Sequence, residues 1–139
     1  GRTDYSIGYG YFLDSGSNKL FLGAGYEARG KKDGVDYGDE TTLLGQGSFS
    51  LTPSVSLVGE LAFVMTGDTT DDTGHEETDP LVSLEIGGMY SLSNTTDLIG
   101  TILIPSGGDT TTYDNAGIVD TTFTIDSATG ILVGLRSRF

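Results

Sequence analysis

The last nine residues of the chain alternate between apolar side chains and polar or small ones. One set of alternate positions is apolar except at its fourth member: Ile131, Val133, Leu135, Ser137 and Phe139. The intervening positions carry two guanidinium groups: Leu132, Gly134, Arg136 and Arg138. Because successive side chains of a β-strand point to opposite faces, this segment predicts a strand with one apolar and one charged face.

This C-terminal strand resembles that of bacterial outer-membrane β-barrels, which end in alternating apolar residues closed by a terminal Phe. In that class of protein the pattern is the signal read by the barrel-insertion machinery. The resemblance implies an outer-membrane location in a Gram-negative bacterium, a lipid bilayer around the chain, and recognition of Phe139 by the machinery. Ser137 departs from the pattern, because a larger apolar or aromatic residue is common at that position.

The composition favours a single all-β domain over residues 1–139. The chain has 22 Gly and 3 Pro, which disfavour helices and suit strands with tight turns. It has no Cys, so disulfides and thiolate metal sites are excluded. A net charge of −13 argues against nucleic acid as a partner. No window approaches the roughly 20 apolar residues of a membrane helix, whereas barrel strands need only about 9–11 alternating residues.

Alternation of the same kind recurs along the chain and predicts seven or eight antiparallel strands. The segments are Asp4–Leu13, Lys19–Arg29, Thr41–Leu51, Val55–Thr66, Leu81–Leu92, Thr96–Pro105, Ile118–Ile125 and Gly130–Phe139. The connections between these segments alternate between short turns and long polar loops. The long loops are expected at 30–39, 67–80 and 106–117. Short and long connections in alternation are typical of an up-and-down transmembrane barrel.

An aromatic-x-Leu motif precedes each short turn, at Tyr11, Phe49 and Tyr90, with a spacing of about forty residues. Together with Phe139 these residues predict an aromatic girdle at the periplasmic interface. If Phe139 belongs to this girdle, the last strand runs toward the periplasm and only seven strands span. We then expect Ile118–Ile125 in an external excursion, and further strands before Gly1; the alternative is an eight-stranded barrel with Phe139 on the outer side.

The first eleven residues, GRTDYSIGYGY, resemble a mid-barrel strand of the phenol-degradation MetA-type transporter family. That resemblance, with the short-turn pattern and the terminal Phe, implies a porin-like barrel of about twelve strands, of which this chain is the C-terminal part. It assigns no binding residue.

Charged residues occupy the positions opposite the apolar ones: Glu27, Arg29, Glu60, Glu85, Arg136 and Arg138. In a membrane barrel these side chains face the lumen, where they must be paired or hydrated. One interpretation is a charged constriction that selects solutes, with Arg favouring anions and Glu favouring cations. The other is a salt-bridged plug that fills a narrow barrel.

Acidic residues and the single histidine crowd the segment between the fourth and fifth predicted strands: Asp68, Asp71, Asp72, His75, Glu76, Glu77 and Asp79. Their spacing lacks the fixed Gly and Glu positions of an EF-hand loop, so we expect a solvated loop without a metal. A catalytic triad would have to be anchored on His75 in this loop. We therefore expect neither an enzyme nor a cofactor.

The sequence thus predicts a porin-like outer-membrane channel for passive transport of small solutes. Two alternatives stay open: a non-conducting structural or surface-interaction barrel, and a soluble secreted β-sandwich that binds a partner. In the β-sandwich the apolar faces would form an internal core, and alternation alone does not separate that fold from a barrel.

Overall fold

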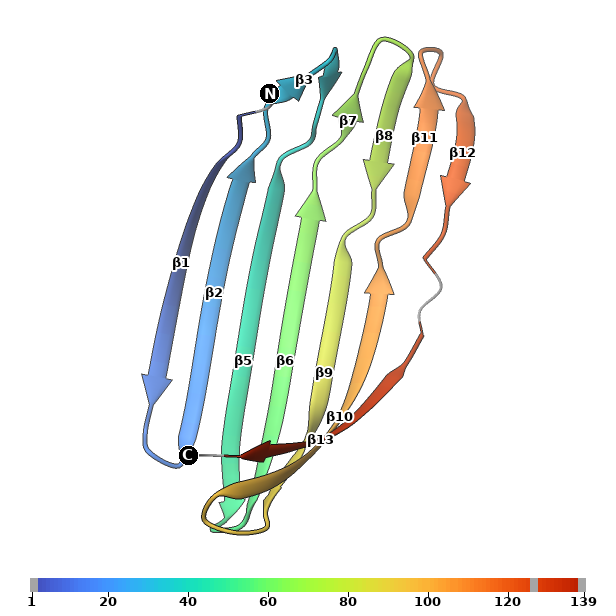
Figure 1. The fold of residues 1–139 in the computed structure, drawn as a ribbon. Helices are drawn as coiled ribbons and strands as arrows, with labels where there is room; N and C mark the ends of the chain where they lie inside the picture. The colour runs from blue at the N-terminus through green and yellow to red at the C-terminus, as the bar shows by residue number, and fades with distance from the viewer. Residues whose placement is uncertain (1–2, 126–127, 138–139) are drawn as a thin grey trace.

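Seven long strands form the main sheet of the computed structural model, which describes residues 3–125 and 128–137. In spatial order the strands are β1 (Tyr5–Asp14), β2 (Asn18–Ala28), β5 (Glu40–Thr52), β6 (Val55–Thr66), β9 (Leu81–Ser91), β10 (Thr96–Gly107) and β13 (Gly130–Ser137). Every neighbouring pair is antiparallel, so the chain runs up and down across the sheet (Figure 1). The prediction of an all-β, antiparallel fold is confirmed.

Six shorter strands form a second antiparallel sheet. They are β3 (Lys31–Lys32), β4 (Val35–Asp36), β7 (Thr69–Thr70), β8 (Gly74–Thr78), β11 (Thr110–Asp114) and β12 (Val119–Phe123). The prediction of plain loops at 30–39, 67–80 and 106–117 was therefore wrong. These segments are polar, but their paired arms hydrogen-bond to one another, and the β-branched threonines suit a strand.

The second sheet continues the main sheet, as the upper half of Figure 1 shows. Short irregular segments separate the two sheets, and together they form the belt: 29–30, 37–39, 67–68, 79–80, 108–109 and 124–125. The pairings β4–β7, β7–β8, β8–β11 and β11–β12 repeat the order β5–β6, β6–β9, β9–β10 and β10–β13. The segment Ile118–Ile125 contributes β12 to this second sheet, so it adds no strand to the main one. That placement agrees with the seven-strand interpretation.

Carboxylates replace the strand ladder at the belt between the two sheets. Asp39 Oδ1 accepts a hydrogen bond from the Arg29 amide (3.0 Å), and Asp4 Oδ1 accepts one from the Gly30 amide (3.0 Å). Asp109 Oδ1 accepts one from the Ile125 amide (2.9 Å). These backbone N–H groups have no strand partner at the belt, and the carboxylates supply the missing hydrogen-bond acceptors. The chain can therefore leave the main sheet without burying unpaired N–H groups.

The main sheet is open in the part of the chain that the structure describes. Its edges are β1 and β13, and the sheet curls strongly toward the β13 side (Figure 1). Six successive antiparallel pairings separate the two edges, so β1 and β13 run in the same direction. The structure therefore shows an open antiparallel sheet whose two edge strands run in parallel.

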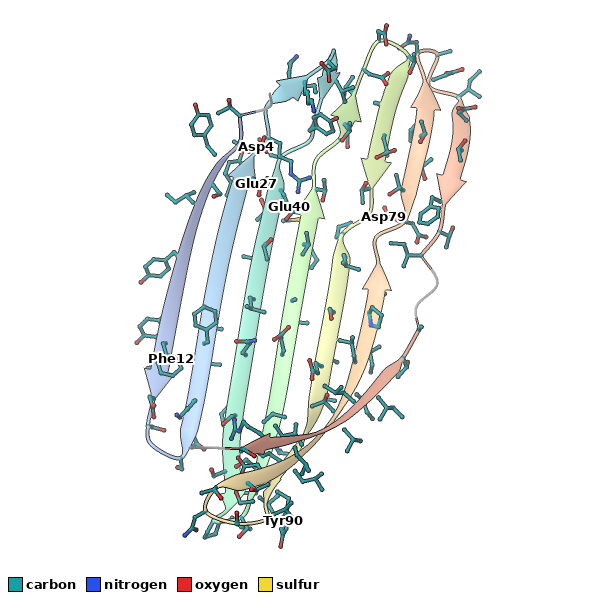
Figure 2. The ribbon with its side chains drawn as sticks, viewed as in Figure 1. Asp4, Phe12, Glu27, Glu40, Asp79 and Tyr90 are labelled. Atoms are coloured by element: carbon teal, nitrogen blue, oxygen red, sulfur yellow. The ribbon has the colours of Figure 1, made fainter. Side chains whose placement is uncertain are left out.

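The two faces of the main sheet differ in chemistry, because the register aligns positions of one parity on all seven strands. One row reads Leu13, Leu20, Gly47, Gly59, Ile86, Ile102 and Ile131. Side chains project from both faces along the strands (Figure 2). Among the described residues no apolar side chain is buried, and Ile131 is 78% exposed. The apolar residues therefore form an uncovered face instead of a core.

Within the described ranges, no helix is long and apolar enough to cross a membrane.

Candidate functional site

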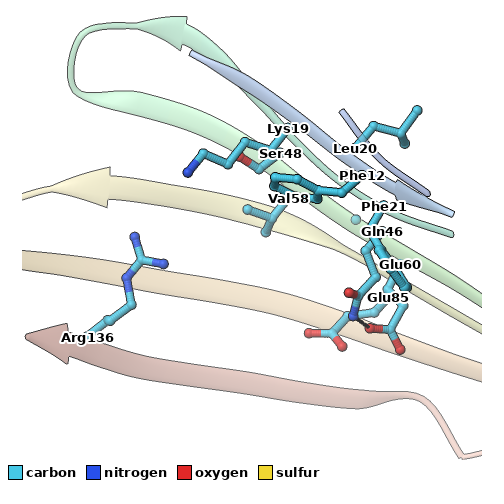
Figure 3. Close-up of a pocket in the computed structure, with 12 residues that line it drawn as sticks. Phe12, Lys19, Leu20, Phe21, Gln46, Ser48, Val58, Glu60, Glu85 and Arg136 are labelled. Carbon is cyan, nitrogen blue, oxygen red and sulfur yellow. Dashed lines mark hydrogen bonds between the residues drawn. The ribbon is translucent and has the colours of Figure 1, made fainter. Parts of the chain in front are cut away.

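The polar face of the main sheet carries a shallow hollow of about 420 Å³ near its centre. One row of its lining residues crosses the sheet from strand to strand: Phe12, Phe21, Gln46, Glu60 and Glu85. The Gln46 amide nitrogen donates a hydrogen bond to Glu60 Oε2 (Figure 3). The structure thus brings together Glu60 and Glu85, two of the predicted site residues, in directly opposed positions on β6 and β9.

Arg136 lines the same hollow but is bound to a buried carboxylate near the short turns. Its Nη2 and Nε donate to Asp97 Oδ2 at 2.8 and 3.2 Å, and Asp97 Oδ1 accepts a hydrogen bond from Ser91 Oγ (2.9 Å). Asp97 is fully buried, whereas the Arg136 side chain is half exposed. The guanidinium charge is therefore neutralised at close range, and Figure 3 shows Arg136 apart from the two glutamates.

A second cluster lies at the opposite end of the polar face, where β2 and β5 reach the belt. Arg29 forms an ion pair with Glu40, and its Nε lies 3.4 Å from Glu27 Oε1. Glu27 and Glu40 lie side by side at this end (Figure 2). The neighbouring Asp39 accepts hydrogen bonds from the Tyr26 hydroxyl and the Arg29 amide, which together lower the pKa of that carboxyl. One guanidinium thus bridges carboxylates of β2 and β5 and holds the ends of these two strands together.

The charged residues predicted to face the lumen fall into separate groups in the structure. Glu27 and Arg29 belong to the cluster at the belt, Glu60 and Glu85 to the central hollow, and Arg136 to the end with the short turns. Arg138 lies outside the described residues.

Asp97, Glu40 and Gln46 were missed at the sequence level. Each lies at a position that alternation assigns to the polar face, while the next residue in the sequence (Leu98, Thr41 and Gly47, respectively) lies on the apolar face. Alternation could therefore have placed them on the polar face. Alternation carries no information on which polar residues meet across neighbouring strands, because that depends on the register.

The acidic segment at 67–80 is ordered into β7 and β8. His75 stacks on Tyr113 of β11, with ring centroids 4.8 Å apart, and its Nε2 lies 3.4 Å from Glu77 Oε1. Asp71 accepts hydrogen bonds from the Thr73 hydroxyl (2.6 Å) and amide (2.7 Å) at the turn between the strands. Over the described ranges, no group of three or more His, Asp or Glu side chains is arranged to hold a metal ion.

The aromatic residues predicted at the membrane interface lie at one end of the sheet. Tyr11, Phe49 and Tyr90 share the parity of the apolar face, sit close to the short turns, and are 50%, 49% and 50% exposed. Phe139 lies outside the described residues.

Comparisons of the chain with protein-family models, with curated proteins and with solved structures gave no match.

Proposed function

We propose that the chain is part of the wall of a bacterial outer-membrane β-barrel that acts as a porin-like channel for small solutes. The observation that supports this proposal most is the uncovered apolar face, to which all seven main strands contribute. Soluble monomers rarely expose a continuous apolar surface of such extent. Lipid hydrocarbon would cover that face, while the opposite face, with its carboxylates and guanidinium groups, would border water.

The dimensions of the main sheet are consistent with a bilayer. Its strands have 8 to 13 residues, and a tilted strand needs about 9–11 residues to cross the hydrocarbon core. In this arrangement Tyr11, Phe49 and Tyr90 form an aromatic girdle at one membrane interface, which we assign to the periplasmic side because the turns there are short. The second sheet then extends the wall beyond the opposite interface.

Closure of the wall requires more strands than the main sheet supplies. In lipid, the free backbone groups of β1 and β13 must find partners. Direct pairing of these two edges would be parallel, since both strands run in the same direction. A second copy in the same orientation would also create parallel seams. An odd number of additional strands gives an even, fully antiparallel barrel, and we propose that further polypeptide provides them.

The paired charges favour a second candidate, a non-conducting structural or surface-interaction barrel. Arg29 with Glu40 and Arg136 with Asp97 are ion pairs of the kind that could fill a narrow lumen. The soluble β-sandwich receives no such support, because the second sheet continues the main sheet and leaves its apolar face open.

Two measurements test the proposed function. The protein should stay monodisperse only in detergent or lipid, and a monodisperse species in plain buffer would contradict the membrane location. The closed barrel, made of this chain together with the strands that complete the wall, should produce discrete current steps in planar bilayers. Folded protein that inserts without current steps would leave the non-conducting barrel as the better description.

A further inference from the structure

The central row of the polar face combines apolar and anionic groups in a fixed order. Phe12 pairs with Phe21, Phe21 with Gln46, Gln46 with Glu60, and Glu60 with Glu85. Because neighbouring strands lie about 4.8 Å apart, the row places Phe21 two strand spacings from Glu60 and three from Glu85. All five side chains line the same hollow.

The two glutamates of this row oppose each other, and no cation among the described residues is paired with either of them. Like charges in directly opposed cross-strand positions are destabilising. Gln46 donates only to Glu60, and Glu85 forms no ion pair within the described residues. The described cations of the polar face are paired with other carboxylates: Lys19 with Asp14, Arg29 with Glu40, and Arg136 with Asp97. Lys19 and Arg136 line the hollow, but neither is paired with Glu60 or Glu85. A sequence that breaks a local rule in this way is expected to do so at a functional site.

The aromatic end of the row is equally unusual for a face that borders water. Phe12 is 57% exposed. Phe21 lies flat against two glycines, since a Cβ at Gly10 would come within 2.8 Å and one at Gly23 within 3.0 Å of its ring. The lack of a Cβ at these two positions therefore lets the Phe21 ring lie close to the backbone of the sheet. The volume of about 420 Å³ falls within the roughly 300–1,000 Å³ of small-molecule sites.

We propose that this row is the solute subsite of the channel and that it takes organic cations. An ammonium group would sit between Glu60 and Glu85, and the apolar body of the solute would lie on Phe12 and Phe21. Carboxylates attract the charge, and aromatic rings attract both the apolar body and the cation. Anionic solutes are disfavoured because the two cations that line the hollow, Lys19 and Arg136, are already paired with Asp14 and Asp97. This inference rests on the proposed channel function.

The test uses benzyltrimethylammonium as the probe, titrated into detergent-folded protein and followed by NMR. We expect the double variant Glu60→Gln/Glu85→Gln to weaken binding at least about tenfold, because both charges are lost while the side-chain size is kept. Phe12→Leu should weaken binding about threefold. The matched control is Glu77→Gln in the second sheet, which should bind as the unmodified protein does. Benzyl alcohol has the aromatic ring without the positive charge, and K⁺ has the charge without the ring. Both should bind more weakly than the probe.

The same variants are then compared in planar bilayers, where the probe should block K⁺ current in the unmodified protein and in Glu77→Gln. Unchanged binding and block in Glu60→Gln/Glu85→Gln would overturn the subsite, although the channel itself would stand. Binding that depends on the two glutamates without any channel current would overturn the proposed transport function but leave the cation site in place.

Discussion

At the scale of single residues, Asp97 differs from the other carboxylates of the polar face, because it is fully buried and bound by an arginine and a serine. It accepts hydrogen bonds from Ser91 on β9 and Arg136 on β13, and so joins three neighbouring strands. Burial of a charge is tolerated only where such partners are present. Asp97 therefore anchors the edge strand β13 to the rest of the sheet.

Replacement of this anchor should destabilise the fold. Asp97→Ala leaves the Ser91 hydroxyl and the Arg136 guanidinium without their acceptor, which should cost about 1–3 kcal/mol of unfolding free energy. Urea unfolding in lipid vesicles measures the effect. The control is Lys19→Gln, which removes an exposed 3.6 Å ion pair with Asp14 and should change stability by less than about 0.5 kcal/mol. Equal effects of the two substitutions would contradict the anchoring role.

Asp71 should make the turn between β7 and β8 sensitive to acid. The Thr73 hydroxyl, followed by the Thr73 and Gly74 amides, lowers the pKa of the Asp71 carboxyl. Because the folded pKa lies below the unfolded value, the stabilisation is present above about pH 4 and is lost as the pH falls through the folded value. Hydrogen exchange of the Gly74 amide, relative to an unstructured peptide, should therefore accelerate below about pH 4.

The pH dependence of the turn has a matched pair of variants. Asp71→Asn should abolish it, whereas Asp72→Asn, which keeps the Asp71 carboxylate, should preserve it. An acid-induced change of equal size in Asp71→Asn would place the responsible group elsewhere.

At the scale of elements, β9 and β10 lie close to each other at Gly87. A Cβ at this position would lie 2.1 Å from the Gly100 carbonyl oxygen and 2.7 Å from Thr101 Cα. These are backbone atoms of the neighbouring strand, so the clash cannot be relieved by a rotamer change. The lack of a side chain at Gly87 therefore lets β9 and β10 lie at this short distance from each other.

Gly87→Ala should push these two strands apart and cost about 1–3 kcal/mol, measured by urea unfolding in vesicles. Gly134→Ala on β13 is the control, since its Cβ would meet no atom within 4 Å. That variant should stay within about 1 kcal/mol of the unmodified protein. Similar losses for both would mean that the substitution of any strand glycine is harmful, whatever its neighbours.

At the scale of the whole molecule, the proposal assigns lipid to one face and water to the other. Ile86 lies in the middle of the apolar face, between Gly59 and Ile102. Ile86→Arg should cost about 2–4 kcal/mol if this face contacts the bilayer centre. Ser83→Arg, on the opposite face of the same strand, should cost less than about 1 kcal/mol. Unfolding of vesicle-inserted protein distinguishes the two, and a larger loss for Ser83→Arg would reverse the assignment of faces.

Much of the main sheet was predictable because alternation directly reports a strand with unlike faces. The expected Val55–Thr66 coincides with β6, and Leu81–Leu92 exceeds β9 by one residue. The second sheet was not predictable in the same way. Its strands, such as Thr69–Thr70 and Lys31–Lys32, are too short and too polar for a periodic signal, and they form because the long arms of the main sheet bring them into register.

The sequence by itself determined the class of fold and the division into an apolar and a charged face, since both follow from local alternation along each strand. Only the tertiary structure decided which charges meet. Arg136 was predicted to face the lumen, in either a selective constriction or a salt-bridged plug. The register sets it beside Asp97 and leaves Glu60 facing Glu85. The physical reason is that cross-strand contacts depend on pairing between distant segments, which no single strand encodes.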